Sequence, residues 1–286
     1  MAEPQGNREH KDRLFLKVFE DKEALLSLYN AVNGSDYENP EELEITTLDN
    51  VLYMRMKNDL SFLIDGSLNF YEHQSTFNPN MPLRGCFYMV KVYQEYVERR
   101  QLDIYSSTRL TLPTPRFIVF YNGTDRMKHM PELTLKLSDS FEKQEEEPAL
   151  ECKARVININ YGFNTEIMEK CPKLYEYSFL ISKIREETSQ GKKLEAAIGA
   201  AIDICVEEGI LTDLLTSYRM EVIGMLLTEY DEERHLKNTY EEGVKKGQKK
   251  GESIGEFRQL YKLIQKNFLT LHDAASANSM TEEQLM

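Results

Sequence analysis

The sequence predicts an α/β fold: a sandwich of helices around a mixed central sheet, followed by a helical C-terminal region. Three observations predict it. The first part of the chain alternates helical periodicity with short, extended apolar runs. Two of those runs flank the tight-turn pair Asp65-Gly66, which is typical of a β-hairpin. From about Asn164 onward, only helical patterns follow.

The bulk composition fits a globular chain with a real core. Of 286 residues, 41% are hydrophobic and 10% aromatic, which argues against wholesale disorder. No run approaches the roughly 20 apolar residues of a membrane-spanning helix, and the polar stretch Met1 to Lys11 has no signal-peptide core. The four cysteines lie far apart without a CxxC pair. We therefore expect reduced thiols in a cytoplasmic protein, with no membrane partner.

The elements of the first part follow from periodicity and turn residues. Apolar residues at helical spacing predict one helix from about Asp12, which Asn33-Gly34 ends. The stretch Asn78 to Leu83 holds two prolines and is typical of a loop, and Tyr88 to Arg100 has a helical pattern. The predicted strands are Leu43 to Thr47, Val51 to Met56, Leu60 to Ile64, Leu68 to Ser75, Phe117 to Tyr121 and Arg155 to Tyr161. We expect residues 1–165 to form one domain.

Residues 166–235 read as a helical region. Its predicted helices are Leu174 to Ile184, Leu194 to Glu207 and Leu211 to Tyr230. The last segment, residues 257–286, predicts two short helices with a turn near Leu269 to His272, which suggests a small helix-turn-helix-like unit.

Residues 236–256 hold a glycine at every fourth position: Gly243, Gly247, Gly251 and Gly255. Period four places these glycines in a stripe along one helical face. The residues between them are charged, which excludes a packed membrane helix pair. Two alternatives remain: a solvated helical linker, in which each glycine costs about 1 kcal/mol relative to alanine, and a close-packed helix pair in a homodimer.

The hairpin places three polar residues on one face. If Asp65-Gly66 forms the two-residue turn, the numbers of paired residues sum to 131, so Asp59 faces Glu72. Gln74 shares that face, because it lies two residues beyond Glu72, and His73 points the other way. Two carboxylates with Cβ atoms about 4.5–5.5 Å apart repel each other. Solvent, a nearby cation or a bound divalent metal must offset that repulsion; carboxylate oxygens and waters suit Mg²⁺.

The same residues resemble a known group of proteins. An aspartate at the start of one strand, followed by Glu-x-Gln or Glu-x-Lys on the next, is similar to the motif of the PD-(D/E)XK nuclease superfamily. The strings Asn58-Asp59-Leu60 and Glu72-His73-Gln74-Ser75-Thr76 resemble its Rpn branch, the recombination-promoting nucleases that are also labelled putative transposases. The resemblance extends to Asp12 to Phe19, Met81 to Arg84 with Phe87-Tyr88, Pro115 to Gly123, and the glycine tail.

This resemblance implies a restriction-endonuclease-like sandwich and a function. The implied activity is hydrolysis of phosphodiester bonds in DNA with Mg²⁺, or Mn²⁺, in recombination or mobile elements. Asp59 and Glu72 would be metal ligands, with the backbone carbonyl of His73 as a third. Gln74 stands where many superfamily members have lysine. Its neutral amide can hydrogen-bond an attacking water but supplies no charge, so the resemblance assigns water activation to the metal.

Four further residues are candidates near that site. Lys57 or Arg84 would supply the missing charge and contact substrate phosphate, although a structural ion pair is an equal alternative for Arg84. An acidic residue of the first helix often approaches the metal in the superfamily. Asp12 is the first candidate for that role and Glu20 the second; an N-cap is the alternative for Asp12.

The net charge of −13 opposes a nuclease function, because DNA backbones attract lysine and arginine. A local basic groove or a bound divalent metal can still offset acidic residues where the backbone docks. Together with the neutral Gln74, this charge leaves an alternative function: a weak or inactive nuclease-like domain that serves as a binding or assembly module.

Overall fold

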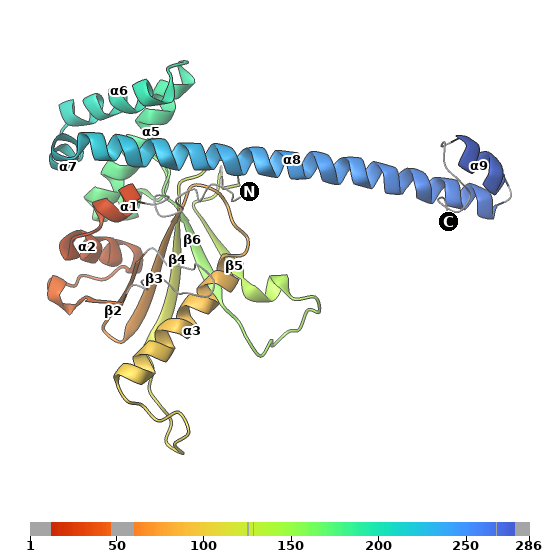
Figure 1. Ribbon diagram of the computed structural model, residues 1–286. Coiled ribbons are helices and arrows are strands. Elements are labelled where there is room, and N and C mark those ends of the chain that lie inside the picture. Colours follow the sequence, from red (N-terminus) through yellow and green to blue (C-terminus); the bar gives the residue numbers. More distant parts are fainter. Residues whose placement is uncertain (1–12, 47–59, 125, 128, 267, 278–286) are drawn as a thin grey trace, which may run out of the picture. The chain divides into compact units, whose positions relative to one another are not determined.

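The computed structural model describes residues 13–46, 60–124, 126–127, 129–266 and 268–277. The chain divides into two compact units, Met1–Tyr230 and Asp231–Met286. The first unit contains a six-stranded mixed sheet with helices on both faces (Figure 1). The predicted α/β class with a mixed sheet is therefore confirmed, and the restriction-endonuclease-like arrangement stays a prediction.

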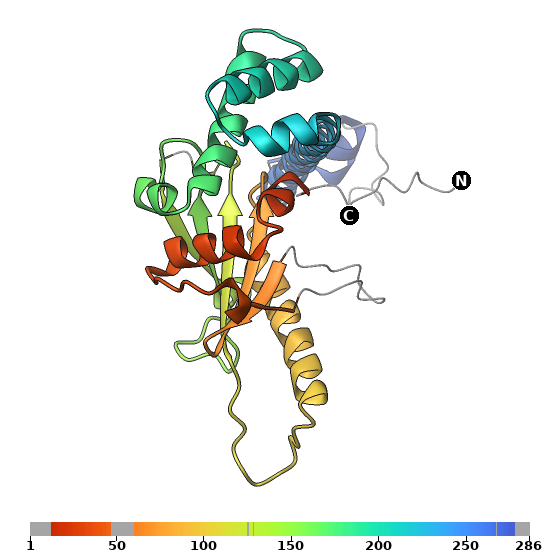
Figure 2. The same ribbon diagram turned by 90° about the vertical axis from the view of Figure 1, so that its left-hand side faces the viewer.

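The sheet has the strand order β1-β2-β3-β4-β6-β5. Strands β3, β4 and β6 run parallel to one another at its centre, and the remaining pairs are antiparallel (Figure 2). The carboxyl ends of the three central strands therefore meet at one edge. The strands are β1 (Glu44–Ile45), β2 (Leu60–Ile64), β3 (Ser67–Gln74), β4 (Thr114–Tyr121), β5 (Glu132–Lys136) and β6 (Lys153–Asn158).

The hairpin between β2 and β3 has the predicted turn and register. Asp65 and Gly66 have φ values of 44° and 67°, as a type I′ turn requires at both central positions. The pairs run from Leu60↔Tyr71 to Ile64↔Ser67, so each sums to 131. The predicted register is confirmed over the described pairs. The predicted strand Val51 to Met56 lies outside the described residues.

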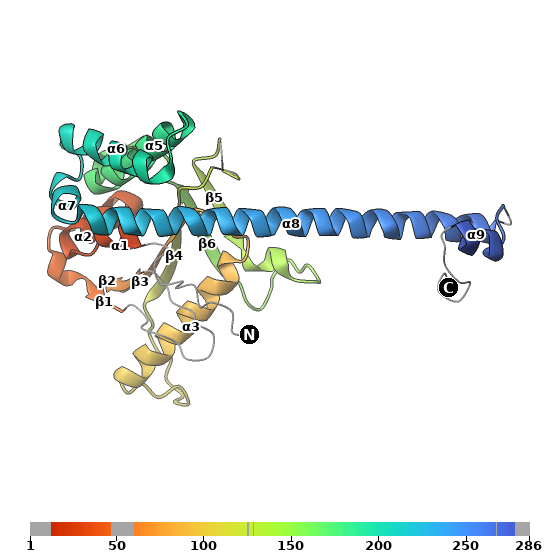
Figure 3. The same ribbon diagram turned by 45° about the horizontal axis from the view of Figure 1, so that its top comes forward.

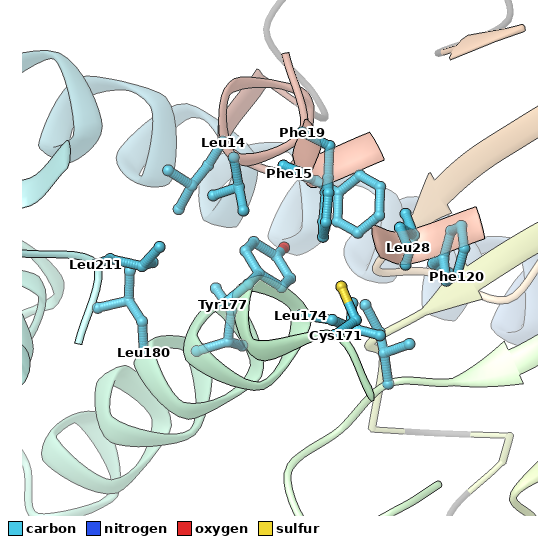
Figure 4. Close-up of a cluster of buried hydrophobic side chains, with 14 of the residues drawn as sticks. Leu14, Phe15, Phe19, Leu28, Phe120, Cys171, Leu174, Tyr177, Leu180 and Leu211 are labelled. Atoms are coloured by element: carbon cyan, nitrogen blue, oxygen red, sulfur yellow. The ribbon is translucent and has the colours of Figure 1, made fainter. Parts of the chain in front are cut away.

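One face of the sheet shares a hydrophobic core with a group of helices. These helices are α1 (Arg13–Val18), α2 (Lys22–Asn33), α4 (Thr165–Lys170), α5 (Pro172–Ser189), α6 (Leu194–Glu207), α7 (Thr212–Ser217) and the start of α8 (Arg219–Gln265). Helices α5 and α6 pack on each other (Figure 3). The ring of Phe15 lies among three others, with centroids 4.8 Å from Phe19, 5.3 Å from Phe120 of β4 and 5.5 Å from Tyr177 of α5 (Figure 4). The helices that follow residue 165 thus share a core with those that precede it.

The opposite face carries α3 (Met81–Arg99), which connects β3 to β4. A second hydrophobic cluster joins Tyr88 and Val92 of α3 to Phe70, Phe117 and Val156 of the sheet. The described residues of the first unit also form two short 3₁₀ helices, Pro40–Glu42 and Leu137–Ser140.

Two predictions near the N-terminus were wrong in part. The single helix expected up to Gly34 is two helices, because Asp21 adopts an extended conformation and accepts a hydrogen bond from Ala24 N at 2.7 Å, which starts α2. The expected loop Asn78 to Leu83 already contains the first turn of α3. Pro82 is tolerated there because a first-turn residue needs no N–H partner within the helix.

Two further differences lie later in the chain. Strand β5 was not predicted; its side chains are half-buried or exposed at the sheet edge, so its hydrophobic signal is weak. The helix expected from Leu211 to Tyr230 is broken at Tyr218, between α7 and α8. By contrast, α6 has the predicted bounds, and α5 extends the predicted helix at both ends.

The second unit consists of the rest of α8 and of α9 (Leu271–Ala277). The glycine stripe lies within α8. The first of the two predicted short helices is thus the end of a long one, and the turn falls just before Leu271. Thr270 caps α9: its Oγ1 accepts from Asp273 N at 3.1 Å and donates to Asp273 Oδ2 at 2.6 Å.

Two predictions from composition can be compared with the described part of the chain. No helix there has both the length and the apolar character needed to cross a bilayer. The four cysteines are free thiols, and three of them, Cys152, Cys171 and Cys205, are buried. Burial raises the pKa of Cys152 to about 11 and that of Cys205 to about 12.

Candidate functional site

The carboxyl ends of β3, β4 and β6 bring polar residues to one edge of the sheet. In open α/β sheets, ligands bind in the crevice outside these ends. Strand pairing aligns Gln74 with Tyr121 and Tyr121 with Asn158, so these three side chains form a row on the face that α3 covers. Glu72 stands two residues earlier in β3, on the same face.

Glu72 is a buried carboxylate in an ion pair. Its side chain is 1% exposed, and its Oε2 accepts a hydrogen bond from Arg84 Nη2 at 3.1 Å. Arg84 is 33% exposed, so the guanidinium reaches from the buried carboxylate toward solvent. A carboxylate this deep remains ionised only with a partner of this kind. Of the two alternatives for Arg84, the ion pair is therefore present.

Several neutral acceptors hold the same guanidinium. Arg84 donates to the Tyr88 hydroxyl from Nη2 at 2.8 Å and from Nε at 3.2 Å, and Nη1 contacts Met81 Sδ at 3.4 Å. With its amide oriented by the hydrogen-bond network, Gln74 accepts from Arg84 Nη1 through Oε1 at 2.8 Å. Arg84 thus joins Glu72 and Gln74, which confirms that the two β3 side chains share a face.

A glycine next to Arg84 lets α3 approach the sheet. A Cβ built on Gly85 would lie 2.3 Å from Cδ1 of Phe117 in β4. Any larger residue would push the helix outward. Gly85 therefore lets α3 pack close to the sheet, which brings Arg84 within reach of Glu72 and Gln74.

His73 points to the opposite face, as predicted. Its ring stacks on Phe15 of α1 with centroids 4.9 Å apart, and its Nε2 lies 2.9 Å from the Tyr177 hydroxyl of α5. Burial lowers the pKa of His73 to about 4; Glu229 opposes that shift and Arg185 adds to it. The imidazole is therefore neutral at neutral pH. Its position between Glu72 and Gln74 places its backbone carbonyl at the same end of β3.

Sequence reasoning missed the residues of α5 that hold the strand ends together. The Tyr177 hydroxyl, already in contact with His73, accepts from Asn122 Nδ2 at 3.1 Å. Arg185 donates to the backbone carbonyl of Asn122 and to Asn160 Oδ1, the latter at 2.5 Å. Tyr177 and Arg185 thus bridge the ends of β3, β4 and β6.

Polar residues at or just after the ends of the strands were the available signal for this cluster. Asn122 follows β4, and Asn158 ends β6. Gly123, next to Asn122, fills a tight space: a Cβ there would lie 2.3 Å from the Ser75 carbonyl oxygen. Asn158 donates to the carbonyls of Met127 and Met130 at 2.9 and 3.0 Å, which anchors the loop after β4.

The remaining predicted site residues divide into two groups. Asp59, Asp12 and Lys57 lie outside the described residues, so their positions stay predictions. Glu20, the second candidate for the helix acid, is 59% exposed and pairs with Lys17 at 3.0 Å. Within the described ranges, no group of three or more His, Cys, Asp or Glu side chains has the geometry of a metal site; the predicted ligand set includes Asp59, which those ranges do not contain.

Comparisons with known proteins do not assign the chain to a family. Neither the family models, nor the curated proteins, nor the solved structures gave a match.

Proposed function

We propose that this chain is a metal-dependent nuclease that hydrolyses phosphodiester bonds in DNA, with Asp59, Glu72 and Gln74 at its site. The observation that carries the proposal is the buried Glu72, held by Arg84 beside Gln74 at the ends of three parallel strands. The motif resemblance makes membership of the Rpn branch, with a restriction-endonuclease-like fold and a role in recombination or mobile elements, part of the same proposal.

The donor chemistry fits Mg²⁺ or Mn²⁺. Glu72 offers a carboxylate, and the next step of the observed hairpin register would pair Asp59 with it. The two carboxylates and the His73 carbonyl are oxygen donors, which these cations prefer. When bound, such an ion supplies electrostatic stabilisation of a phosphoryl oxygen and lowers the pKa of water.

The other residues have supporting roles in this proposal. Gln74 orients water by hydrogen bonding without adding charge. In this proposal, Arg84 or Lys57 contacts substrate phosphate and stabilises the negative charge that develops on it. Asp12 remains the proposed acid from the first helix.

Cleavage of supercoiled DNA with Mg²⁺ tests the proposal. We expect the wild-type chain to nick the plasmid, and Asp59→Asn and Glu72→Gln to lose this activity while remaining folded. Glu187→Gln is the matched control, because Glu187 is also a buried carboxylate in an ion pair, with Lys192 of the segment after α5. Equal nicking by all four proteins would contradict the proposal, since it would indicate a contaminating nuclease.

A nuclease-like binding or assembly module is the second candidate. Two observations favour it: the net charge of −13, and the guanidinium that already neutralises Glu72. This candidate predicts no heat of Mn²⁺ binding that depends on Glu72. Isothermal titration of the wild type and Glu72→Gln separates the two candidates, because the nuclease proposal requires a binding heat that the variant loses.

A further inference from the structure

Arg84 pairs with the carboxylate that a divalent cation would use as a ligand. Its Nη2 lies 3.1 Å from Glu72 Oε2, and the carboxylate is almost fully buried. A guanidinium and a divalent cation on one buried carboxylate repel each other, because both are positive and the surroundings screen charge poorly. The contact with Arg84 therefore weakens metal binding by Glu72, and loss of that contact strengthens it.

The contacts of Arg84 allow it to leave Glu72 without being released from the site. Tyr88 and Gln74 hold the guanidinium through neutral acceptors, which do not depend on Glu72. The side chain is 33% exposed and lies at the sheet edge where a ligand would enter. A guanidinium binds phosphate oxygens through two parallel hydrogen bonds, so an incoming phosphate can replace the carboxylate as its anionic partner.

We propose that Arg84 exchanges anions: it pairs with Glu72 in the metal-free protein and with a substrate phosphate once Glu72 holds a divalent cation. The inference depends on the proposed function, since it takes Glu72 as a metal ligand. Its consequence is cooperative binding. Phosphate draws Arg84 away from Glu72 and thereby tightens metal binding, and by reciprocity the metal tightens phosphate binding.

Isothermal titration of Mn²⁺ into the full chain tests the exchange. Sulfate serves as the tetrahedral dianion, and chloride at equal ionic strength is the reference. We expect sulfate to tighten Mn²⁺ binding to the wild type by at least about fivefold, the lower end of common coupling factors. Arg84→Gln should bind Mn²⁺ at least as tightly as the wild type in chloride and should not respond to sulfate. Lys91→Gln, which alters an exposed ion pair on the same helix, should behave as the wild type.

The outcomes separate this inference from the proposed function. Mn²⁺ binding that Glu72→Gln abolishes but that sulfate leaves unchanged in the wild type would overturn the exchange and spare the metal site. Weaker Mn²⁺ binding by folded Arg84→Gln would overturn it as well. Absence of Mn²⁺ binding to the wild type would overturn both. If Arg84→Gln does not fold, the comparison of Mn²⁺ binding to the wild type in sulfate and in chloride still tests the exchange.

Discussion

At the scale of single residues, the candidate site depends on a glycine in α3. Gly85 lets α3 lie against Phe117, and the neighbouring Arg84 consequently reaches Glu72. The hairpin register was predictable because Asp65-Gly66 fixes the turn and a pleated strand alternates faces. The Arg84–Glu72 contact was not, because it depends on how closely a helix packs on a sheet.

Gly85→Ala should therefore destabilise the first unit. The added methyl group would overlap the Phe117 ring, and overpacking of this kind costs about 1–3 kcal/mol. Gly199→Ala is the control: it is also helical, but its added Cβ would meet nothing within 4 Å, so we expect a gain of about 0.5–1 kcal/mol. Urea unfolding measures both, and similar stability of the two variants would contradict the close-approach argument.

Tyr37 contributes to stability in a pH-dependent way. Its hydroxyl donates to Asp65 Oδ2 at 2.5 Å, which fastens the hairpin turn. This hydrogen bond raises the pKa of Tyr37 from 10.0 to about 12. Since the folded state favours the protonated phenol, the contribution is complete below pH 10 and is lost as the pH rises toward 12.

Tyr37→Phe should therefore have a lower free energy of unfolding than the wild type at pH 8. This difference should shrink as the pH rises from 10 to 12. Unfolding by urea at each pH gives the comparison. The difference in free energy of unfolding between the wild type and the variant cancels the contributions of the other tyrosines and lysines, which titrate in both proteins. A gap that persists unchanged at pH 12 would contradict the role of the phenolic proton.

At the scale of elements, α5 fastens the strand ends from the face opposite to Glu72. Its bounds were largely predictable from periodicity, but its role was not. Tyr177 lies 104 residues from His73 in the chain, and Arg185 lies 63 residues from Asn122. No local pattern encodes contacts at such separations; they follow only once the core has placed α5 on the sheet.

Arg185→Met tests this fastening. The variant keeps most of the apolar length but removes the charged hydrogen bonds to Asn122 and Asn160, so we expect a loss of about 1.5–3 kcal/mol. Lys183→Met is the matched control on the same helix, because its ion pair with Glu186 is exposed and should contribute little to stability. Equal urea midpoints for the two variants would contradict the proposed bridge.

At the scale of the whole molecule, the net charge bears on DNA binding. A net charge of −13 repels DNA at long range, but salt at about 0.1 M screens interactions beyond about 10 Å. Nucleic-acid binding would therefore depend on cations near the strand ends, such as Arg84. The charge balance of the sequence cannot reveal that local arrangement.

Substitution of the glycine stripe in α8 distinguishes a solvated helix from a helix pair between two copies of the chain. Side chains added at Gly243, Gly247, Gly251 and Gly255 would meet nothing within 4 Å in the single chain. Alanine at all four positions should therefore stabilise this part of α8, by about 1 kcal/mol per site in a solvated helix. Circular dichroism at the helical minimum during heating, with sedimentation of the full chain, provides the measurement.

The matched control substitutes alanine one position further along, at Val244, Gln248 and Glu252, which keeps the glycines and changes a neighbouring stripe. We expect this control to gain much less helicity than the glycine variant, and both proteins to sediment as the wild type does. One outcome would contradict the solvated-helix interpretation. A glycine variant that loses helicity and falls from dimer to monomer, while the control does neither, would show that the glycines permit close contact between two copies. In that case the stripe would be an interface and not a linker.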